Sequence, residues 1–439
     1  MTTGLKISVA VFGLGLLSAC SQSDPILPGE RLALRAGDLA AAAETENRAL
    51  AANLPAALSN GQWAQSPVSP FARTTHAALQ LPLQQVWSTS IGDGDKRRKR
   101  LNTTPVSDGA RIYTMSSDLR ITATDTSGAA VWTHQLETPR DSAASVQGGG
   151  LGVADGVLYA TSGLGQLTAL EAATGSVVWT QDLDTVATGA PTIYGGLVYL
   201  TSGDNIGWAI ETDSGRVRWQ TETVADINNV AGAPAPALEG DRVVFGFGNG
   251  QIQTTFRQGG LSLWSSEIAG QRKGRAVNTV GDITGDPVIA DGSLYAGNHS
   301  GSMAGFDLFS GDRKWTLAEG ALHQPWVAGG SVYFVSDLNE LKRVDAETGE
   351  QIWSVELPGW VPSARPHKRR DRSYVNYGPI LAGGQLIVAS SDGAIRMFNP
   401  EDGALTSQVD IPGGATTSPI VVNGTLYVVS KKGTLFAYR

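Results

Sequence analysis

The sequence predicts an all-β fold, an eight-bladed β-propeller of four-stranded antiparallel blades. Three observations predict it. A strand-and-turn pattern recurs with its tryptophans 38 to 51 residues apart, a glycine precedes the tryptophan by four positions in six copies, and one more tryptophan, Trp87, stands before the first copy. Repeats of about 40 to 50 residues with four strands each are typical of propeller blades.

Each copy starts with an Asp-Gly or Gly-Gly turn, continues through two strands, and ends in a Gly turn and a Trp-bearing strand. ADGVLYATSGLGQLTALEAATGSVVW, which starts at Ala154, shows the whole pattern. Glycine permits the positive φ of a tight hairpin, and we expect the tryptophan to face the layer between neighbouring blades. The six pairs are Gly128 and Trp132, Gly175 and Trp179, Gly215 and Trp219, Gly260 and Trp264, Gly311 and Trp315, and Gly349 and Trp353.

The two ends of the chain predict how the ring closes. A seventh copy keeps Gly403 but has Ser407 at the Trp position, and an eighth stops at Arg439 before reaching a Trp. Trp87 supplies the missing strand, so we expect residues 83–89 to pair with the C-terminal strands in a propeller that spans residues 81–439. A linear solenoid is the alternative, but it would leave Trp87 unexplained and its sheet edges unpaired.

The N-terminus predicts export. Lys6 precedes an apolar run over residues 7–17, followed by Ser18, Ala19 and the only cysteine of the chain, Cys20. This is the layout of a secretory signal peptide over residues 1–19. A transmembrane helix that contains a free cysteine is the alternative, but the run is too short to cross a bilayer of about 30 Å.

The stretch LSAC resembles the lipobox of bacterial lipoproteins. The resemblance implies cleavage before Cys20, attachment of acyl chains such as palmitate to this residue, and a membrane anchor. Ser21 rather than aspartate follows the cysteine, which in that family favours the outer membrane. Residues 20–80 are rich in Ala and Pro, and we expect them to form a lipidated tether.

Composition and motifs indicate no catalysis. A single cysteine excludes an intramolecular disulfide and cysteine-based metal sites. The five histidines show no metal-ligand spacing, and no nucleophile-elbow or phosphate-loop motif is present. We therefore expect no catalytic residues, no metal and no cofactor.

The segments ALEAATGSVVW, GFDLFSGDRKW and RVDAETGEQIW are similar to the PQQ-like repeat of quinoprotein propellers, and the similarity extends from residue 83 to the end. Within that family the chain resembles the BamB-like lipoproteins. This resemblance implies a periplasm-facing, non-catalytic outer-membrane scaffold that binds a BamA-like subunit and assists insertion of outer-membrane proteins, with direct contact to unfolded outer-membrane proteins left open.

Two other functions stay open beside it. A pyrroloquinoline-quinone dehydrogenase or quinone-binding propeller is the second interpretation, although the dehydrogenases carry a vicinal-cysteine disulfide that this chain cannot form. A cell-envelope binding or sensor propeller with another partner is the third.

The longest loops are predicted to share one face. We name the four strands of a blade A to D in chain order. In an antiparallel blade, the B–C connection and the connection from strand D to strand A of the next blade lie on one side, and the A–B and C–D turns lie on the other. The unusual segments 93–100, 224–234, 270–286 and 358–372 are all D-to-A connections. Two of them resemble partner-contact loops of the BamB-like family, which places Asp282 and Thr284 at acidic positions and Val230 and Ala231 at a leucine and an arginine.

Three further points concern this face. For Asp282, a structural role in capping a turn is the alternative to a partner contact. Trp360 is an additional candidate contact. The basic loops 96–100 and 367–372, on a chain of net charge −8, have three interpretations: solvated charge, nucleic-acid binding, which export disfavours, and docking on an acidic protein or anionic lipid.

Overall fold

The computed structural model describes residues 46–71, 73–136, 148–224, 233–268, 280–362 and 372–439. Glu46–Arg439 form one compact unit. Secondary structure in the described ranges consists of β-strands. These ranges include no helix with the length and hydropathy of a membrane span. Cys20, Val230 and Ala231 lie outside the described residues.

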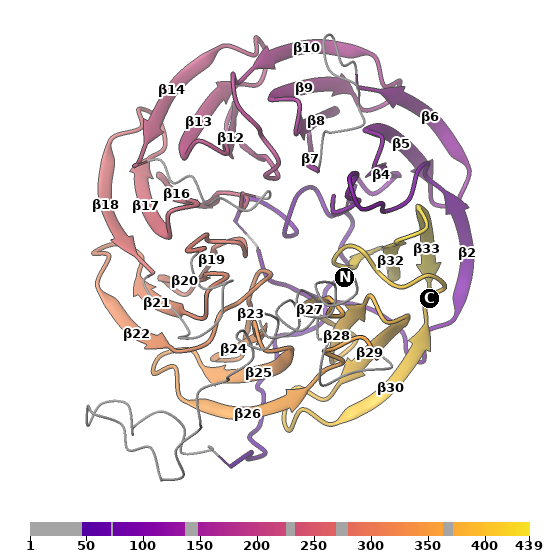
Figure 1. The fold of residues 1–439 in the computed structure, drawn as a ribbon, viewed down its shortest axis with the longest axis vertical. Helices are drawn as coiled ribbons and strands as arrows, with labels where there is room; N and C mark the ends of the chain where they lie inside the picture. Colours follow the sequence, from indigo (N-terminus) through magenta and orange to yellow (C-terminus); the bar gives the residue numbers. More distant parts are fainter. Residues whose placement is uncertain (1–45, 72, 137–147, 225–232, 269–279, 363–371) are drawn as a thin grey trace, which may run out of the picture. The chain divides into compact units, whose positions relative to one another are not determined.

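Eight antiparallel blades, each with four strands in the propeller pattern, are arranged in a ring around a common centre, which confirms the predicted fold (Figure 1). Blades 1 to 4 run from the inner to the outer strand in sequence order. They comprise β3 (Val106–Ser107), β4 (Arg111–Met115), β5 (Arg120–Asp125) and β6 (Ala130–Gln135); β7 (Gly149–Ala154), β8 (Val157–Ser162), β9 (Gln166–Glu171) and β10 (Val177–Asp182); β11 (Thr192–Tyr194), β12 (Leu197–Thr201), β13 (Ile206–Glu211) and β14 (Val217–Glu222); and β15 (Ala237–Glu239), β16 (Arg242–Gly246), β17 (Gln251–Phe256) and β18 (Ser262–Glu267).

Blades 5 to 7 follow the same order, and blade 8 takes its outer strand from the N-terminal side. They comprise β19 (Val288–Ala290), β20 (Ser293–Gly297), β21 (Met303–Asp307) and β22 (Arg313–Leu317); β23 (Trp326–Ala328), β24 (Ser331–Val335), β25 (Glu340–Asp345) and β26 (Gln351–Glu356); β27 (Asn376–Ala382), β28 (Gln385–Ser390), β29 (Ala394–Phe398) and β30 (Leu405–Asp410); and β31 (Ile420–Val422), β32 (Thr425–Ser430), β33 (Thr434–Tyr438) and β2 (Gln85–Ser90). A two-residue strand, β1 (His76–Ala77), adds to blade 7 in parallel with β27.

The ring closes as predicted, by pairing of β2 with β33. The antiparallel register sets Trp87 opposite Ala437 and Ser90 opposite Thr434. The backbone N–H groups of Gln84 and Arg439 each donate to the carbonyl of the other residue at 2.9 Å, which extends the pairing beyond β2 and β33. The first and last strands of the propeller therefore share one blade, and no open sheet edge remains at this seam.

Burial explains the residue pattern of the strands. The middle strands are covered on both faces by adjacent blades, so β8 is buried along nearly its whole length. Such strands read as continuous apolar runs. The outer strand β10 alternates between exposed and half-buried positions, because only one of its faces meets a neighbouring blade.

The repeated tryptophan packs onto the turn glycine of the following blade. The ring of Trp132 is so close to Gly175 that a Cβ on this glycine would lie 2.5 Å from the ring atom Cε3. Every indole N–H in the series donates to a carbonyl just before that glycine, over 2.8 to 3.1 Å. The seven contacts are Trp87 on Gly128, Trp132 on Gly175, Trp179 on Gly215, Trp219 on Gly260, Trp264 on Gly311, Trp315 on Gly349, and Trp353 on Gly403.

The same geometry explains why Ser407 replaces tryptophan. Its strand, β30, belongs to blade 7 and faces blade 8. The third and fourth strands of blade 8 are β33 and β2, which belong to opposite ends of the propeller and have no turn between them. No glycine turn exists there for a tryptophan to cover. Instead, the hydroxyl of Tyr438 donates to the carbonyl of Asp410 at 2.9 Å across this junction.

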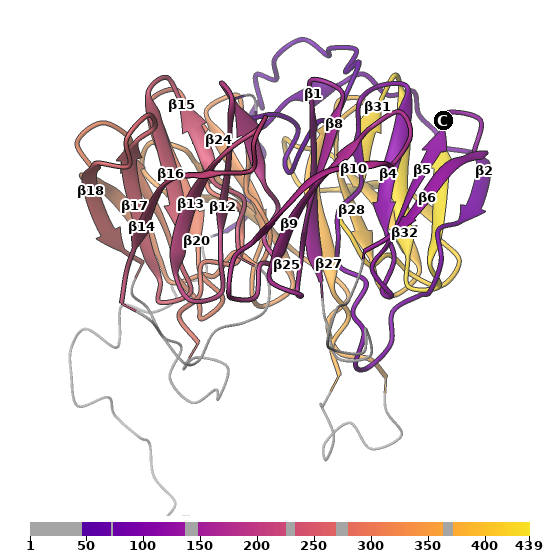
Figure 2. The same ribbon diagram turned by 90° about the horizontal axis from the view of Figure 1, so that it is seen from above.

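The two faces of the propeller differ in their connections, as Figure 2 shows from the side. Each outer strand ends beside the B–C turn of its own blade: Leu183 N–H donates to the carbonyl of Gly165, and Ile411 N–H to that of Gly393. The D-to-A connections and the B–C turns therefore share one side, called the loop face below. The short A–B and C–D turns lie on the opposite side, called the turn face.

Residues 46–80 correct part of the expected tether. They pack on the propeller along the turn face, with Ala52 and Trp63 each 2% exposed. The backbone of Asn60 accepts a hydrogen bond from Asn423 N–H, and Ala77 one from Gly383 N–H. The physical reason is burial of apolar side chains, which a free tether would leave in water. Residues 20–45 lie outside the described part.

The tryptophan contact can be tested with two matched glycines. Gly175 and Gly156 have φ angles of +76° and +78°, but a Cβ on Gly156 would have no atom within 4 Å. Replacing Gly156 with alanine should cost about 1 kcal/mol for the left-handed conformation alone. Gly175→Ala should cost about 1–3 kcal/mol more, because the methyl group displaces Trp132. Urea unfolding measures both, and equal losses would contradict the contact's importance.

Candidate functional site

The centre of the propeller is closed on the turn face by residues 63–71 and 73–77. Trp63 bridges to Ser107 of β3, and Gln65 to Gly152 of β7. The Trp63 ring stacks on Trp326 of β23 with centroids 6.2 Å apart. Strands β3, β7 and β23 are the inner strands of three different blades. This segment, called the plug below, therefore holds blades together at the channel as well as closing it.

Arg73 fixes the plug to blades 3 and 4. The residue is 1% exposed, and its guanidinium donates to the carbonyls of Ser66 (3.0 Å), Ala235 (3.2 Å) and Pro236, and to the hydroxyl of Thr192. Burial lowers the pKa of Arg73 to about 10, while the charge of Asp286 opposes this shift. Because a buried cation with this many hydrogen-bond acceptors is held strongly and in one geometry, Arg73 attaches the plug specifically to blades 3 and 4.

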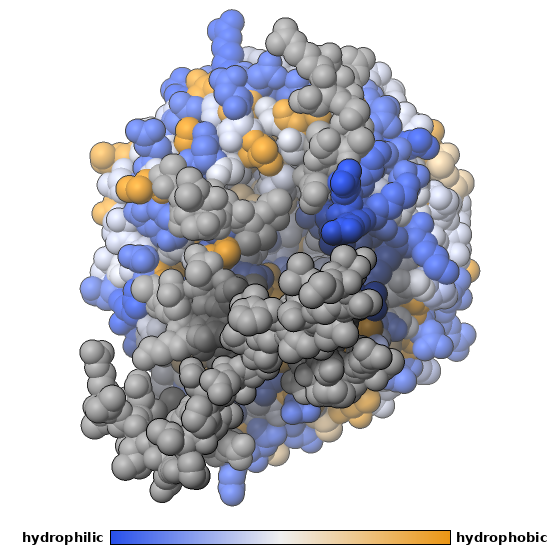
Figure 3. Space-filling model, in the orientation of Figure 1, coloured by the Kyte–Doolittle hydropathy of each residue, from blue (hydrophilic) through white to orange (hydrophobic). Residues whose placement is uncertain are grey.

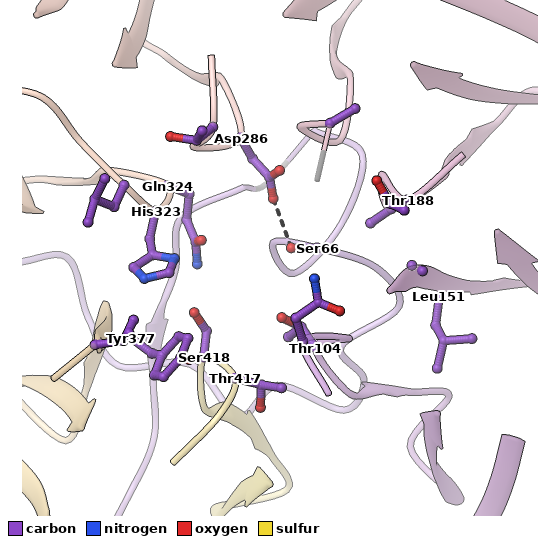
Figure 4. Close-up of a pocket in the computed structure, with 18 of the residues that line it drawn as sticks. Ser66, Thr104, Leu151, Thr188, Asp286, His323, Gln324, Tyr377, Thr417 and Ser418 are labelled. Carbon is purple, nitrogen blue, oxygen red and sulfur yellow. Dashed lines mark hydrogen bonds between the residues drawn. The ribbon is translucent and has the colours of Figure 1, made fainter. Parts of the chain in front are cut away.

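Above the plug, the channel forms a pocket of about 380 Å³ at the level of the D-to-A connections (Figure 4). Ser66 of the plug contributes to its floor, and the wall comes from segments of several blades. The polar side chains of the wall are mostly neutral hydroxyls and amides. They include Thr104, Thr188, Gln324, Thr417 and Ser418.

Asp286 is the acidic group in this wall. Its carboxylate accepts bonds from the Ser66 hydroxyl (2.8 Å) and the Ala235 N–H (2.7 Å). Burial raises its pKa, and the nearby charge of Arg73 and the two hydrogen bonds only partly offset this effect. Asp286 thus joins the plug to blades 4 and 5. Its contacts indicate a structural role at the floor of the pocket.

His323 and Tyr377 form another side of the pocket, with ring centroids 5.0 Å apart. Burial lowers the pKa of His323 to about 4 and raises the pKa of Tyr377 to about 12. Both are therefore neutral at pH 7. The described residues provide no group of three or more His, Cys, Asp or Glu side chains that could hold a metal ion.

Asp282 lies inside the structure rather than on its surface. Its side chain is 3% exposed, and its carbonyl accepts a bond from His299 N–H at 3.0 Å. The adjacent Ile283 bridges to Asn298 in the B–C turn of blade 5. This burial favours the structural alternative over a direct charged contact, and the assignment of Asp282 to a partner contact stays a prediction.

The other predicted contacts are placed differently. Thr284 is partly exposed in the pocket wall, and its hydroxyl donates to the carbonyl of Ala321 at 3.4 Å. Trp360 is 50% exposed on the loop face, where a bridge to Ser373 closes the base of its loop. Val230 and Ala231 lie outside the described residues, so their assignment stays a prediction.

Sequence reasoning missed two parts of this site. Val186 and Val224 are 47% and 80% exposed in neighbouring D-to-A connections, and exposed apolar side chains of this kind are common at binding surfaces. The plug was also missed, although Trp63 is a signal within residues 46–80: a large aromatic side chain is unusual in a solvated tether.

Comparison with known proteins places this architecture in a family. The family model described as "Outer membrane protein assembly factor BamB" matches residues 117–355 and 337–439. The chain belongs to the BamB family.

Curated family members support the match over most of the chain. Outer membrane protein assembly factor BamB of Moranella endobia is 23% identical over 361 residues, covering 81% of this chain and 89% of that protein. BamB of Yersinia pestis is also 23% identical, with 81% and 88% covered. A match to BamB of Escherichia coli is 24% identical over 210 residues, about half of either chain.

Solved structures show the same fold. The crystal structure of BamB from Moraxella catarrhalis has a TM-score of 0.66 and 21% identity, covering 82% of this chain and all of that one. Quinohemoprotein alcohol dehydrogenase from Comamonas testosteroni has a TM-score of 0.67 at 16% identity, covering 87% and 81%. At these identities the likeness shows the fold alone.

The pocket of this BamB family member does not fit a carboxylate-bearing quinone such as pyrroloquinoline quinone. Such a cofactor needs cationic partners for its carboxylates. The described pocket wall contains no Lys or Arg side chain, and it presents Asp286 instead. The buried cation of the plug, Arg73, already donates to the plug and to blades 3 and 4.

The neutral state of His323 predicts a dependence of stability on pH. Its pKa is about 4 when folded and about 6.5 in the unfolded chain, so the unfolded state binds this proton first as pH falls. Stability should therefore decrease from about pH 6.5 to pH 4, by up to ~3 kcal/mol. His323→Gln should remove this part of the slope in urea unfolding and leave the slope between pH 7 and 8 unchanged. An identical slope below pH 6.5 in both proteins would contradict the assignment.

Proposed function

We propose that this protein is a non-catalytic scaffold of the outer-membrane β-barrel assembly machinery, and that it binds a BamA-like subunit through its loop face. In this proposal it assists insertion of outer-membrane proteins. It faces the periplasm and is held at the outer membrane by lipid attached to Cys20.

Family membership supports the role, because its relatives are named outer membrane protein assembly factors. The observation that carries the choice of face is the position of the plug and the residues before it. On the turn face, this segment already engages the A–B turns of blades 7 and 8, through the hydrogen bonds from Gly383 N–H to the carbonyl of Ala77 and from Asn423 N–H to the carbonyl of Asn60. The segment thus covers part of the turn face, while the loop face stays available to a partner of the folded propeller.

The loop face also has the side chains that a partner needs. Protein interfaces are built around exposed aromatic and apolar anchors with a polar rim. Trp360, Val224 and Val186 supply such anchors in the D-to-A connections. In the proposal, Thr284, Val230 and Ala231 belong to the same contact surface, and Asp282 supports it from beneath by holding its loop against blade 5.

The proposal predicts a selective effect of an exposed aromatic side chain. Trp360→Ala should weaken recovery of a BamA-like subunit in a mild-detergent pull-down, with a loss of affinity of about 10-fold or more, because aromatic anchors contribute strongly to interfaces. Its melting temperature should stay within about 2 °C of the wild type, because the residue is half exposed. The experiment identifies bound proteins by mass spectrometry.

Phe309→Ala is the matched control. Phe309 is 58% exposed, but it lies in the C–D turn of blade 5, on the turn face. This variant should keep the partner. Loss of the partner from Phe309→Ala but not from Trp360→Ala would contradict the assignment of the face, and a wild-type protein that recovers no barrel-assembly subunit would contradict the proposed function itself.

A further inference from the structure

The basic segment between β2 and β3 forms a short, defined hairpin on the loop face. The backbone N–H and carbonyl groups of Lys96 and Lys99 pair with each other over 2.8 and 3.1 Å. Arg97 and Arg98 form its tip, and both are exposed. Together with Arg100 and the adjacent Lys432, these residues are called the basic hairpin patch below.

Close backbone contacts hold the root of this hairpin. A Cβ on Gly94 would lie 2.4 Å from the carbonyl oxygen of Lys431, so only glycine permits this approach. Asp95 N–H donates to the same carbonyl at 2.7 Å, and the Ser117 hydroxyl donates to the carbonyl of Gly94 at 2.7 Å. The hairpin is thus fastened to the B–C turns of both blade 8 and blade 1.

The patch carries a local excess of positive charge. In segments 91–105, 116–119 and 431–433, seven Lys and Arg residues stand against three aspartates, on a chain whose net charge is −8. The carboxylates are already engaged: Asp93 pairs with Lys96 at 2.6 Å, and Asp95 with Arg100 at 3.1 Å. The third, Asp118, pairs with Arg120 at 3.3 Å.

The cations at the tip are therefore available. Within the described ranges, Arg97, Arg98 and Lys99 have no carboxylate at ion-pair distance. Figure 3 shows the loop face, and strongly hydrophilic side chains gather on it in the sector of β4 and β32. A rigid hairpin with two adjacent guanidinium groups is suited to carboxylates, because each guanidinium can bind one in a bidentate manner.

The surroundings favour a protein over a lipid surface. Peripheral membrane sites usually combine cations with apolar side chains that insert among the lipids. No large apolar residue within 91–105 or 411–433 is exposed. The flanking connection, residues 411–418, contains neither Lys nor Arg. The positive charge is thus concentrated on a protruding hairpin with a polar surround.

We propose that the basic hairpin patch is a docking site for a carboxylate-rich segment of a partner protein. The fixed hairpin presents Arg97 and Arg98 without the entropy loss that a disordered basic segment would incur on binding. This inference does not rest on the proposed function, since any acidic polypeptide that reaches the loop face would satisfy it.

A binding measurement on the full chain tests this inference. The protein carries Cys20→Ser, so that lipid at this position cannot contribute. The probe is a fluorescein-labelled octapeptide of alternating glutamate and glycine, followed by fluorescence anisotropy. Arg97→Gln/Arg98→Gln should weaken binding at least about 5-fold with an unchanged melting temperature. Raising NaCl from about 50 to about 300 mM should weaken wild-type binding, because salt screens exposed charges.

Two controls make the result specific. Arg216→Gln/Arg218→Gln removes two arginines from the end of blade 3 that lies at the turn face and should leave peptide binding within about 2-fold of the wild type. A peptide with glutamine in place of glutamate should not bind. Equal binding by the hairpin variant and the wild type, or no binding of the acidic peptide to either, would overturn the inference.

Vesicles distinguish a membrane from a protein as the source of negative charge. Sedimentation with vesicles of phosphatidylethanolamine and phosphatidylglycerol at about 3:1 should be weak and the same for all variants. Sedimentation that depends on Arg97 and Arg98, in the absence of peptide binding, would replace the protein partner with an anionic lipid surface. Neither result changes the outcome of the pull-down with Trp360→Ala.

Discussion

The packing of each repeat tryptophan on the turn glycine of the next blade is the contact on which the rest of this structure depends. A propeller blade has no stable partner except its neighbours, and here one bulky ring and one N–H donor recur at seven of the eight junctions. The eighth junction lacks the glycine turn and also lacks the tryptophan. Sequence and geometry therefore change together, which indicates that the tryptophan is present to cover that turn.

The plug gives the ring two unlike sides. Trp63 and Arg73 occupy the channel next to the inner strands, and Asp286 connects them to blade 5. This arrangement uses buried polar groups, which are costly to leave unpaired and so fix one position for the segment. Contacts on the turn face thus stabilise the propeller, while the loop face carries the exposed side chains of Trp360, Val186 and Val224 and the basic hairpin.

The fold was predictable because its signal is local and repeated. The glycine-to-tryptophan offset recurs in six copies, and the unmatched Trp87 is enough to predict closure by β2. The plug was not predictable in the same way, since residues 46–80 lack the repeat and Arg73 finds its acceptors in segments more than a hundred residues away. The burial of Asp282 could not be predicted from the sequence either. A Gly-Asp loop can face water or the adjacent turn, and its packing against blade 5 decides between these two positions.

The central claim is that one face of the propeller is structural and the other binds the partner. Hydrogen–deuterium exchange of the protein with and without a purified BamA-like subunit tests it most directly. The account predicts that the partner slows exchange in the loop-face segments 93–102, 280–286 and 357–362, and leaves residues 55–80 and the C–D turns unchanged. Slower exchange at residues 55–80 and in the turns around Gly175 and Gly311, with no change in the loop-face segments, would contradict it.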